Sequence, residues 1–296
     1  MTRTLKSLAV RFPLLVGAIV FAVALVSGQL IEREIGALLL EDAASEADEG
    51  ARQVASMLAS SIPATRSRYA ETVASAKLPQ ALADTLRSSD RLREWARQVG
   101  DTDIVMMRLV DASGTVRASE ARWPAAERVT WAVRAAAERR LSGDSVTIGP
   151  IVAIADSVPG FVVAAPLLAA DGQHRGWYVE LRRVRATGVR DVQRLLRADR
   201  LLVGSLEDGA WTDLERVVPA PQAAPPMGAP AVVPGRDGGP VMAAQVSVAG
   251  TPWLVRVEES EARILSPLRA FVWRLWAAIV AVGLIGAIAS WALGRY

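Results

Sequence analysis

Two long runs without charge, one near each end of the chain, constrain the fold more than any other feature. The first covers residues 12–31, between Arg11 and Glu32, and the second covers residues 275–294. Each run is twenty residues long, which is about the length that an α-helix needs to cross the hydrocarbon core of a bilayer. The sequence therefore predicts two transmembrane helices, 12–31 and 275–294, around a water-exposed middle region.

The charges beside the first run predict its orientation. Residues 1–11 carry three bases and no acid, whereas the residues after the run are rich in glutamate. Basic flanks stay on the cytoplasmic side, so we expect segment 1–11 to be cytoplasmic. A cleaved signal peptide is the alternative, but the run is longer than a usual apolar signal region and is not followed by an A-x-A site. A helical connector at 259–274 and the second span would return the chain, leaving a cytoplasmic stub at 295–296.

This layout predicts a protein of the bacterial inner membrane with a periplasmic or extracellular middle region. The chain has no cysteine, which excludes disulfides, thiolate metal sites and cysteine nucleophiles. Its single histidine, His174, stands in a predicted turn, and no phosphate-binding or nucleophile-elbow motif is present. Acids and bases alternate, and the net charge is only +3, which argues against nucleic-acid binding. We therefore expect no catalytic residues, no metal and no cofactor in this chain.

Residues 32–99 are predicted to form a helical stalk. Apolar residues recur at intervals of four and three, a spacing that keeps one stripe facing a partner. The stripe consists of Leu40, Ala44, Ala47, Ala51, Val54 and Leu58. It can form a homodimer contact or pack on the chain's own middle region, and the sequence leaves both open. Pro63 is predicted to end this helix, and Pro79 is predicted to begin another that runs to about Val99.

Residues 100–184 predict a small antiparallel sheet with helices on one face. A mostly apolar strand at 104–110 is followed by the turn Asp111–Gly114 and a second strand. A helix from Pro124 to about Leu141 then leads to three more strands, which start near residues 146, 161 and 177. This order of strand, turn, strand, helix and three strands is PAS-like, and the fold class is α+β.

The run RLSGDSVTIGPIVAIADSVPGFVVAAPLL, followed by GWYVELRRV, resembles the core of CHASE domains, which are relatives of the Cache sensors. The VDASGTV turn is similar to the hairpin of PAS-like sensors in general. The resemblance covers roughly residues 100–260. It implies that residues 100–184 form a membrane-distal sensory module of a bacterial transmembrane receptor, such as a sensor histidine kinase. It transfers no set of ligand-binding residues.

Residues 185–258 predict a second, smaller αβ module. A short helix at 187–196 precedes strands near residues 201, 241 and 253, and the end of this region also resembles the sensor modules. Between the strands lies segment 218–240, where proline and glycine predict an exposed loop without regular structure.

Six residues are candidates for ligand binding, because a small-molecule pocket needs a few polar groups among apolar walls. They fall on or beside the predicted sheet: Ser119, Arg122, Trp123, Asp156, Phe161 and Tyr178. Arg122 beside Trp123 is the best pair, since a guanidinium next to an aromatic wall suits a carboxylate-bearing ligand.

The layout of span, sheet modules and span predicts a receptor that senses a small ligand and passes the signal across the membrane, acting as a homodimer through its stalk and transmembrane helices. The output, a histidine kinase or similar module, would lie beyond residue 296 or on a separate partner. The alternative is a two-span envelope assembly protein, such as a polysaccharide chain-length regulator. Such proteins favour long helices outside the membrane, whereas this chain gives its middle to short strands.

Overall fold

A computed structural model describes residues 2–75, 78–83, 88–123, 145–155, 157–169, 171–184, 198–205 and 210–293. The chain forms two compact units. The first unit comprises Met1–Ser45 and Ser260–Tyr296, and the second comprises Glu46–Glu259. The predicted helices at 124–141 and 187–196 lie outside the described residues.

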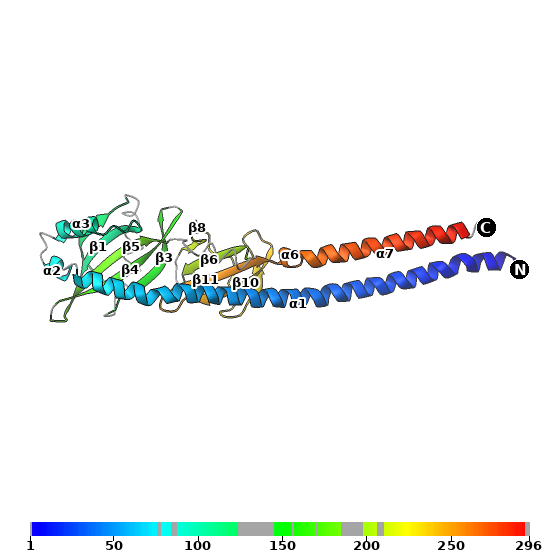
Figure 1. The fold of residues 1–296 in the computed structure, drawn as a ribbon, viewed down its shortest axis with the longest axis horizontal. Helices are drawn as coiled ribbons and strands as arrows, with labels where there is room; N and C mark the ends of the chain where they lie inside the picture. Colours follow the sequence, from blue (N-terminus) through cyan, green and yellow to red (C-terminus); the bar gives the residue numbers. More distant parts are fainter. Residues whose placement is uncertain are drawn as a thin grey trace. The chain divides into compact units, whose positions relative to one another are not determined.

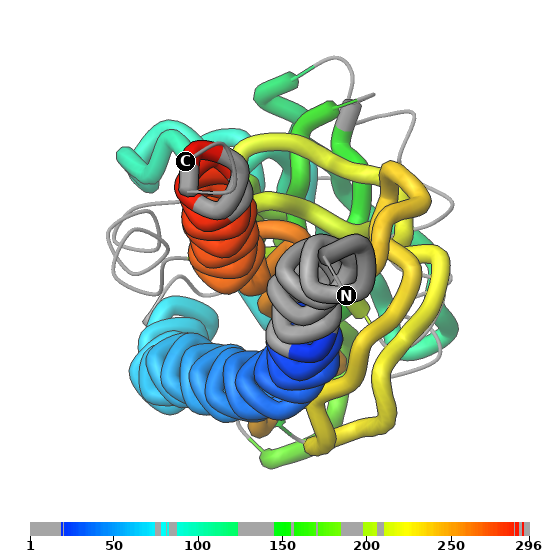
Figure 2. The backbone as a smooth tube through the Cα atoms, turned by 90° about the vertical axis from the view of Figure 1, so that its right-hand side faces the viewer, coloured from blue at the N-terminus to red at the C-terminus, as the bar shows by residue number. Residues whose placement is uncertain are grey.

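The first unit consists of helices. It contains the first part of α1 (Thr2–Ser75), the short α6 (Glu261–Ile264) and α7 (Ser266–Leu293), and Figures 1 and 2 show α1 and α7 side by side in this unit. They approach closely at Gly28, where an added Cβ would meet the Trp276 ring at 3.3 Å, and Phe21 lies 6.0 Å from the same ring. Small residues of this kind let helix backbones come near one another.

One helix of the described residues is long and apolar enough to cross a membrane, at Ser266–Gly286. This apolar stretch begins nine residues before the predicted span 275–294. It includes Arg269 and Arg274, because the helix around these two arginines is apolar enough to outweigh them. The span predicted at 12–31 lies in α1 and stays a prediction.

Helix α1 does not end at Pro63, so that prediction is wrong. It continues to Ser75, and its residues Tyr69 and Val73 are buried beyond the proline. Hydroxyl groups on both sides of the proline donate to carbonyls that precede it, as in the contact of Thr65 Oγ1 with Ser61 O at 2.9 Å. Proline removes one helical hydrogen bond, and burial of the Tyr69 and Val73 side chains after it outweighs that loss.

Two short helices follow, α2 (Leu78–Ala83) and α3 (Ser88–Gln98). They fall within the region predicted as one helix from Pro79 to about Val99, and Leu82, Leu92 and Ala96 are buried.

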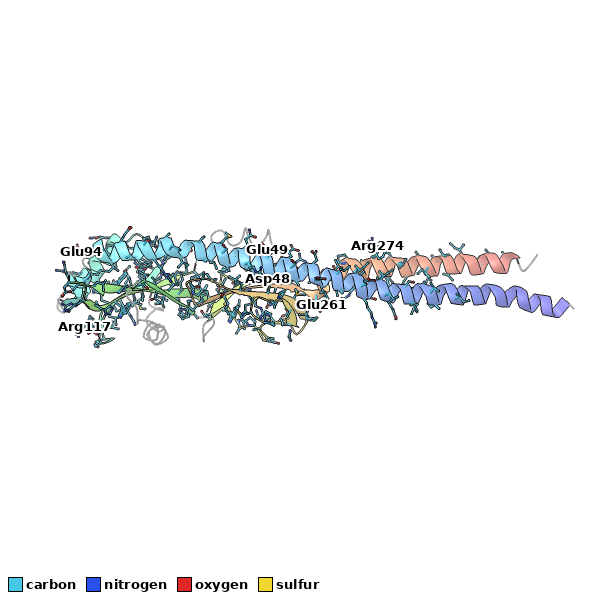
Figure 3. All side chains as sticks on the ribbon, turned by 90° about the horizontal axis from the view of Figure 1, so that it is seen from below. Asp48, Glu49, Glu94, Arg117, Glu261 and Arg274 are labelled. Atoms are coloured by element: carbon cyan, nitrogen blue, oxygen red, sulfur yellow. The ribbon has the colours of Figure 1, made fainter. Side chains whose placement is uncertain are left out.

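The first sheet is antiparallel and has five strands in the order β2-β1-β5-β4-β3. Its strands are β1 (Ile104–Asp111), β2 (Val116–Ala121), β3 (Thr147–Ala155), β4 (Val158–Leu168) and β5 (His174–Arg183). The β1–β2 hairpin, which carries the Arg117 labelled in Figure 3, is closed by the predicted turn, in which Gly114 has φ +82°. The α+β class with antiparallel strands and a long N-terminal helix is confirmed.

Both faces of the first sheet are buried, because alternate residues of each strand point to opposite sides. One face carries Met107, Leu109 and Val163 and packs with residues of α1, α2 and α3. The other face carries Val105, Val162 and Leu181. The mostly apolar first strand is explained by this double burial.

The second sheet has six strands in the order β8-β7-β6-β11-β10-β9. Its strands are β6 (Arg200–Ser205), β7 (Trp211–Thr212), β8 (Val217–Val218), β9 (Ala231–Pro234), β10 (Pro240–Ser247) and β11 (Trp253–Ser260). In Figure 1, the part of α1 from residue 46 onward passes along both sheets. The stripe residues Ala47, Ala51 and Val54 are buried there, which favours packing on the chain's own modules for these three positions.

Segment 218–240 was expected to lack regular structure, and this is wrong for β9. Val241 pairs with Val233, and Pro240 pairs with Pro234. An edge strand can contain proline, because one side of its backbone needs no partner in the sheet.

The two sheets contact each other within the second unit. Ile151 N donates to Ser205 Oγ at 2.9 Å, and Trp253 Nε1 donates to Gly149 O at 2.9 Å. The Phe161 and Trp253 rings meet edge to face at 5.2 Å.

Candidate functional site

A buried polar network lies on the helix-covered face of the first sheet. Tyr178, Glu180 and Arg182 alternate along β5, so their side chains share this face. Glu180 is 3% exposed, and an unpaired carboxylate at such depth would be very costly. Its oxygens instead accept hydrogen bonds from donors of two elements, α1 and β5.

Two tyrosines donate to this carboxylate. Tyr178 Oη donates to Glu180 Oε1 at 2.6 Å, and Tyr69 Oη, from α1, donates to Oε2. Burial raises the pKa of both phenols, and the charge of Glu180 raises it further, so both hydroxyls stay protonated. Trp95 Nε1, from α3, donates to Tyr178 Oη at 3.3 Å.

Arg182 extends the network to the loop after α3. Its Nη1 donates to Glu180 Oε2 at 3.1 Å and to Tyr69 Oη at 2.9 Å, and its Nη2 donates to Asp101 Oδ2 at 2.5 Å. Partial burial would raise the pKa of Asp101, but hydrogen bonds from the Asp103 amide and from Arg182 outweigh it, and the pKa is lowered. The network therefore fastens α1 and α3 to β5, and its polar groups are satisfied by hydrogen bonds with one another.

A groove of about 430 Å³ lies beside this network. Its walls are mostly small or apolar side chains, namely Ala70, Val73, Ala74, Pro79, Val146, Ala165, Pro166 and Leu168. Three polar residues complete the described lining, namely Arg66, Ser67 and Ser145. Apolar walls with a few polar groups are typical of small-molecule sites, and this volume is large enough for a compact metabolite.

Helix α1 contributes five of the residues that line the groove, from Arg66 to Ala74. Arg66 is the one charged residue among the described lining residues. Its Nη2 also donates to Gly250 O at 2.9 Å, in the turn between β10 and β11. The same guanidinium thus borders the groove and contacts the second sheet.

The scan against family models and the search of curated proteins found no match. Several solved structures are similar in architecture. One is the ligand-binding domain of the Campylobacter jejuni chemoreceptor Tlp3 in complex with L-valine, at 12% identity and a TM-score of 0.48, over 78% of this chain and 97% of that one. Another is the extracellular domain of the putative histidine kinase rpHK1S-Z16, at 19% identity and a TM-score of 0.49, over 77% of this chain and 98% of that one.

A third is the ligand-binding domain of the Pseudomonas aeruginosa PAO1 amino-acid chemoreceptor PctC in complex with GABA, at 18% identity and a TM-score of 0.39, over 74% of this chain and 100% of that one. These structures are sensory domains of chemoreceptors and of a histidine kinase, the class that the sequence resemblance indicates. Their TM-scores are below 0.5, so they establish no family for this chain.

The structure separates the five predicted site residues that it describes. Tyr178 belongs to the buried network, and Phe161 packs against the same face and against Trp253. Trp123 packs with the opposite face, where the Arg183 guanidinium lies 5.8 Å from its ring centroid.

Ser119 is exposed on the edge strand β2, and its Oγ accepts a hydrogen bond from Arg108 Nε at 3.3 Å. Arg122 donates to three backbone carbonyls at the end of α3, among them Val99 O at 2.6 Å and Asp101 O at 2.5 Å. Asp156 lies outside the described residues. None of the other five is among the described residues that line the groove, and their role in ligand binding stays a prediction.

Sequence reasoning missed Arg66 and its neighbours because it ended the helix at Pro63. A signal was present: Ile62, Tyr69 and Val73 continue the helical spacing of seven and four residues past the proline. Among the described residues, no cluster of three or more histidine and acidic side chains could hold a metal ion.

Proposed function

We propose that this chain is the ligand-sensing part of a bacterial membrane receptor and that the groove beside α1 binds a small carboxylate-bearing molecule. The observation that carries the proposal is that α1 forms one wall of the groove. A ligand there contacts the same helix that holds the first uncharged run, so its binding energy can favour one position of α1 over another.

A carboxylate fits the groove for a physical reason. Arg66 supplies a planar guanidinium, and Ser67 and Ser145 supply hydroxyl groups. A carboxylate can form two parallel charge-assisted hydrogen bonds with a guanidinium, whereas Gly250 O accepts one bond from Arg66, so the ligand competes well for this side chain. The apolar walls accommodate a short aliphatic side chain.

The test is a titration of the full chain in nanodiscs with a panel of amino acids and dicarboxylates, followed by thermal unfolding and calorimetry. A ligand that binds the native state raises the unfolding temperature by mass action. Arg66→Gln should weaken binding of the active compound about tenfold. Arg97→Gln, an exposed change on α3, is the matched control, and equal binding by the Arg66→Gln protein would refute the proposal. Trp123→Ala in the same titration tests the pair predicted from the sequence.

We also propose that segment 12–31 and helix α7 both cross the inner membrane, with both termini cytoplasmic and both sheets periplasmic. The basic segment 1–11 and the apolar stretch Ser266–Gly286 support this topology. Because the chain has no cysteine, each single substitution to cysteine introduces one thiol for labelling. Ser113→Cys should react with a membrane-impermeant maleimide in spheroplasts, whereas Ser7→Cys should react only after lysis.

The signal would pass to a histidine kinase or similar output, in a homodimer joined through the stalk and transmembrane helices. The chain itself would act by binding and not by catalysis. Disulfide trapping of Ile35→Cys, an exposed position of α1, checks the dimer. Absence of a crosslinked species at several neighbouring positions would argue against the proposed contact.

A further inference from the structure

The second sheet has a cavity of its own, with a volume of about 330 Å³. It is more polar than the groove beside α1, because six of the residues that line it are charged. These are Asp199, Arg200, Asp213, Arg216, Arg236 and Glu258. None of the described residues that line this cavity also lines the groove.

The floor of the cavity is built on the paired strands β6 and β11. Arg200 and Glu258 are register partners across the two strands, and both line the cavity. Arg256 stands two residues before Glu258, on the same face of β11. It is fully buried, and its Nε donates to Glu258 Oε1 at 2.7 Å. A buried ion pair on a central strand is a costly feature that close packing alone does not require.

Polar atoms near this pair lack partners within the described part of the chain. Arg256 Nη1 donates to Ala223 O at 2.6 Å, but Nη2 has no acceptor, and Gln245 Oε1 has no donor. Val248 N bonds Trp253 O in the β10–β11 hairpin, and Gln245 and Arg256 each lie three residues from that closing pair. They therefore lie opposite each other, so the interior beneath segment 219–230 is polar.

The acids of the cavity are already engaged. Asp213 accepts from the amides of Glu215 and Arg216 in its own turn and pairs with the Arg216 guanidinium at 3.3 Å. Glu258 is held by Arg256, and Asp199 also has a partner.

The basic side chains Arg200 and Arg236 are held less firmly by other residues than the acids are. Arg236 is exposed and has no ion pair within the described part of the chain. Arg200 pairs with Asp237 at 3.7 Å, and the Asp237 side chain is 87% exposed. Such a surface pair contributes little, so a ligand can displace it at small cost. The available binding groups of this cavity are therefore guanidinium groups.

Prolines make the walls stiff. Pro219, Pro221 and Pro234 all line the cavity, and each has a fixed φ. A wall that is already ordered loses little entropy when a ligand binds.

We propose that this cavity binds a small anion with a carboxylate or phosphate group, gripped by Arg200 and Arg236, as a second site separate from the groove beside α1. The planar guanidinium group forms two parallel hydrogen bonds to either kind of anion. The site stands on the residues of the second sheet alone and does not depend on the function proposed for the groove.

The experiment is isothermal titration of the full chain, in nanodiscs of zwitterionic lipid at low ionic strength, with citrate and, separately, with inorganic phosphate. At least one of the two probes should bind with one site per chain. Comparison of the two probes distinguishes a carboxylate site from a phosphate site. The double variant Arg200→Gln/Arg236→Gln should weaken that binding at least about tenfold. The double variant Arg200→Lys/Arg236→Lys keeps the charge but loses the planar fork, and its affinity should lie between the two.

Two controls separate this site from the rest of the chain. Arg97→Gln removes an exposed arginine of α3 and should leave the affinity unchanged. Arg66→Gln should also leave it unchanged, so failure of the groove proposal and failure of this one give different results. Because Arg236 is exposed and Arg200 is partly exposed, the variants should keep the unfolding temperature of the parent chain. The proposal is overturned if neither probe binds, if the Gln double variant binds like the parent chain, or if Arg97→Gln weakens binding equally.

Discussion

The two sheets bury charge in opposite ways. In the first sheet, the Glu180 carboxylate accepts bonds from two tyrosines and Arg182, and the network also reaches α1, α3 and the loop that follows α3. In the second sheet, Arg256 has one acidic partner, one carbonyl partner and one nitrogen that has no acceptor among the residues that the structure describes.

Burying a charge costs free energy in both sheets, and the difference shows two uses of such a buried charge. A buried charge whose bonding capacity is filled by its own chain stabilises one arrangement of the surrounding elements. A buried charge with capacity left over marks a place where close packing is not the only requirement on the strand. We therefore interpret the first network as a fastening for α1 and the second pair as a buried support beneath the cavity, whose described lining includes Glu258 but not Arg256.

The largest effect should come from breaking the first network. Glu180→Ala leaves Arg182 and two tyrosine hydroxyls buried without their shared acceptor, and the free energy of unfolding should fall by about 3–5 kcal/mol. Denaturant unfolding followed by tryptophan fluorescence measures the change. Glu94→Ala, at the exposed position on α3 labelled in Figure 3, should change stability by less than about 0.5 kcal/mol. Equal effects of the two variants would contradict the fastening role.

A glycine in each sheet gives a matched pair. A Cβ at Gly160 would lie 2.6 Å from Arg182 O and would also meet Ile154, whereas a Cβ at Gly204 would meet only the Trp211 ring among its three nearest atoms. The backbone carbonyl of Arg182 moves less readily than the Trp211 side chain, which belongs to the two-residue strand β7. Gly160→Ala should therefore destabilise by about 3 kcal/mol and Gly204→Ala by about 1 kcal/mol. The same denaturant experiment ranks them, and the reverse order would show that the second sheet is the stiffer one.

Removal of a single hydroxyl measures the contribution of α1 to the network. Tyr69→Phe keeps the ring but removes the donor to Glu180 and the acceptor for Arg182. Stability should fall by about 1.5–3 kcal/mol, since both bonds involve charged groups. Hydrogen exchange of α1 amides should rise in this variant. Unchanged exchange would mean that apolar burial alone holds the helix.

The smallest effect concerns pH at the turn of the first sheet. Hydrogen bonds from Ser113, the Thr115 amide and Arg117 outweigh the opposing effect of burial and hold the pKa of Asp111 at about 2. A lowered pKa favours the ionised group in the folded state, so this stabilisation is present above the unfolded value of 3.8 and is lost as pH falls through about 2. Asp111→Asn should therefore lose less stability than the parent chain between pH 5 and pH 2. Thermal unfolding over that pH range tests this prediction. Parallel curves of stability against pH for the two proteins would show that Asp111 does not contribute to the pH dependence.

Several elements were predictable because local patterns dictate them. The turn Asp111–Gly114 combines a side chain that bonds backbone amides with a glycine that accepts positive φ. The apolar run of β1 and the segments that start near residues 161 and 177 predicted strands, and the observed β1, β4 and β5 agree within a few residues. The candidate site was harder, since its residues come from α1, α2, β4 and the segment just before β3.

Two corrections show why local rules failed. Pro63 is unfavourable inside a helix, yet the buried side chains beyond it keep α1 intact to Ser75. Prolines around Ala231–Pro234 disfavour a strand, yet an edge position removes the objection. In both places, a contact distant in sequence outweighs a local preference.

The sequence by itself determined the layout of this protein: an uncharged run near each end, antiparallel strands between them, and no cysteine chemistry. These follow from length, periodicity and residue type, which act locally. Only the tertiary structure decided where charge is buried and what it meets. Whether Glu180 or Arg256 is satisfied depends on donors and acceptors brought from helices, loops and neighbouring strands, and the energy of a buried charge is set by those distant partners.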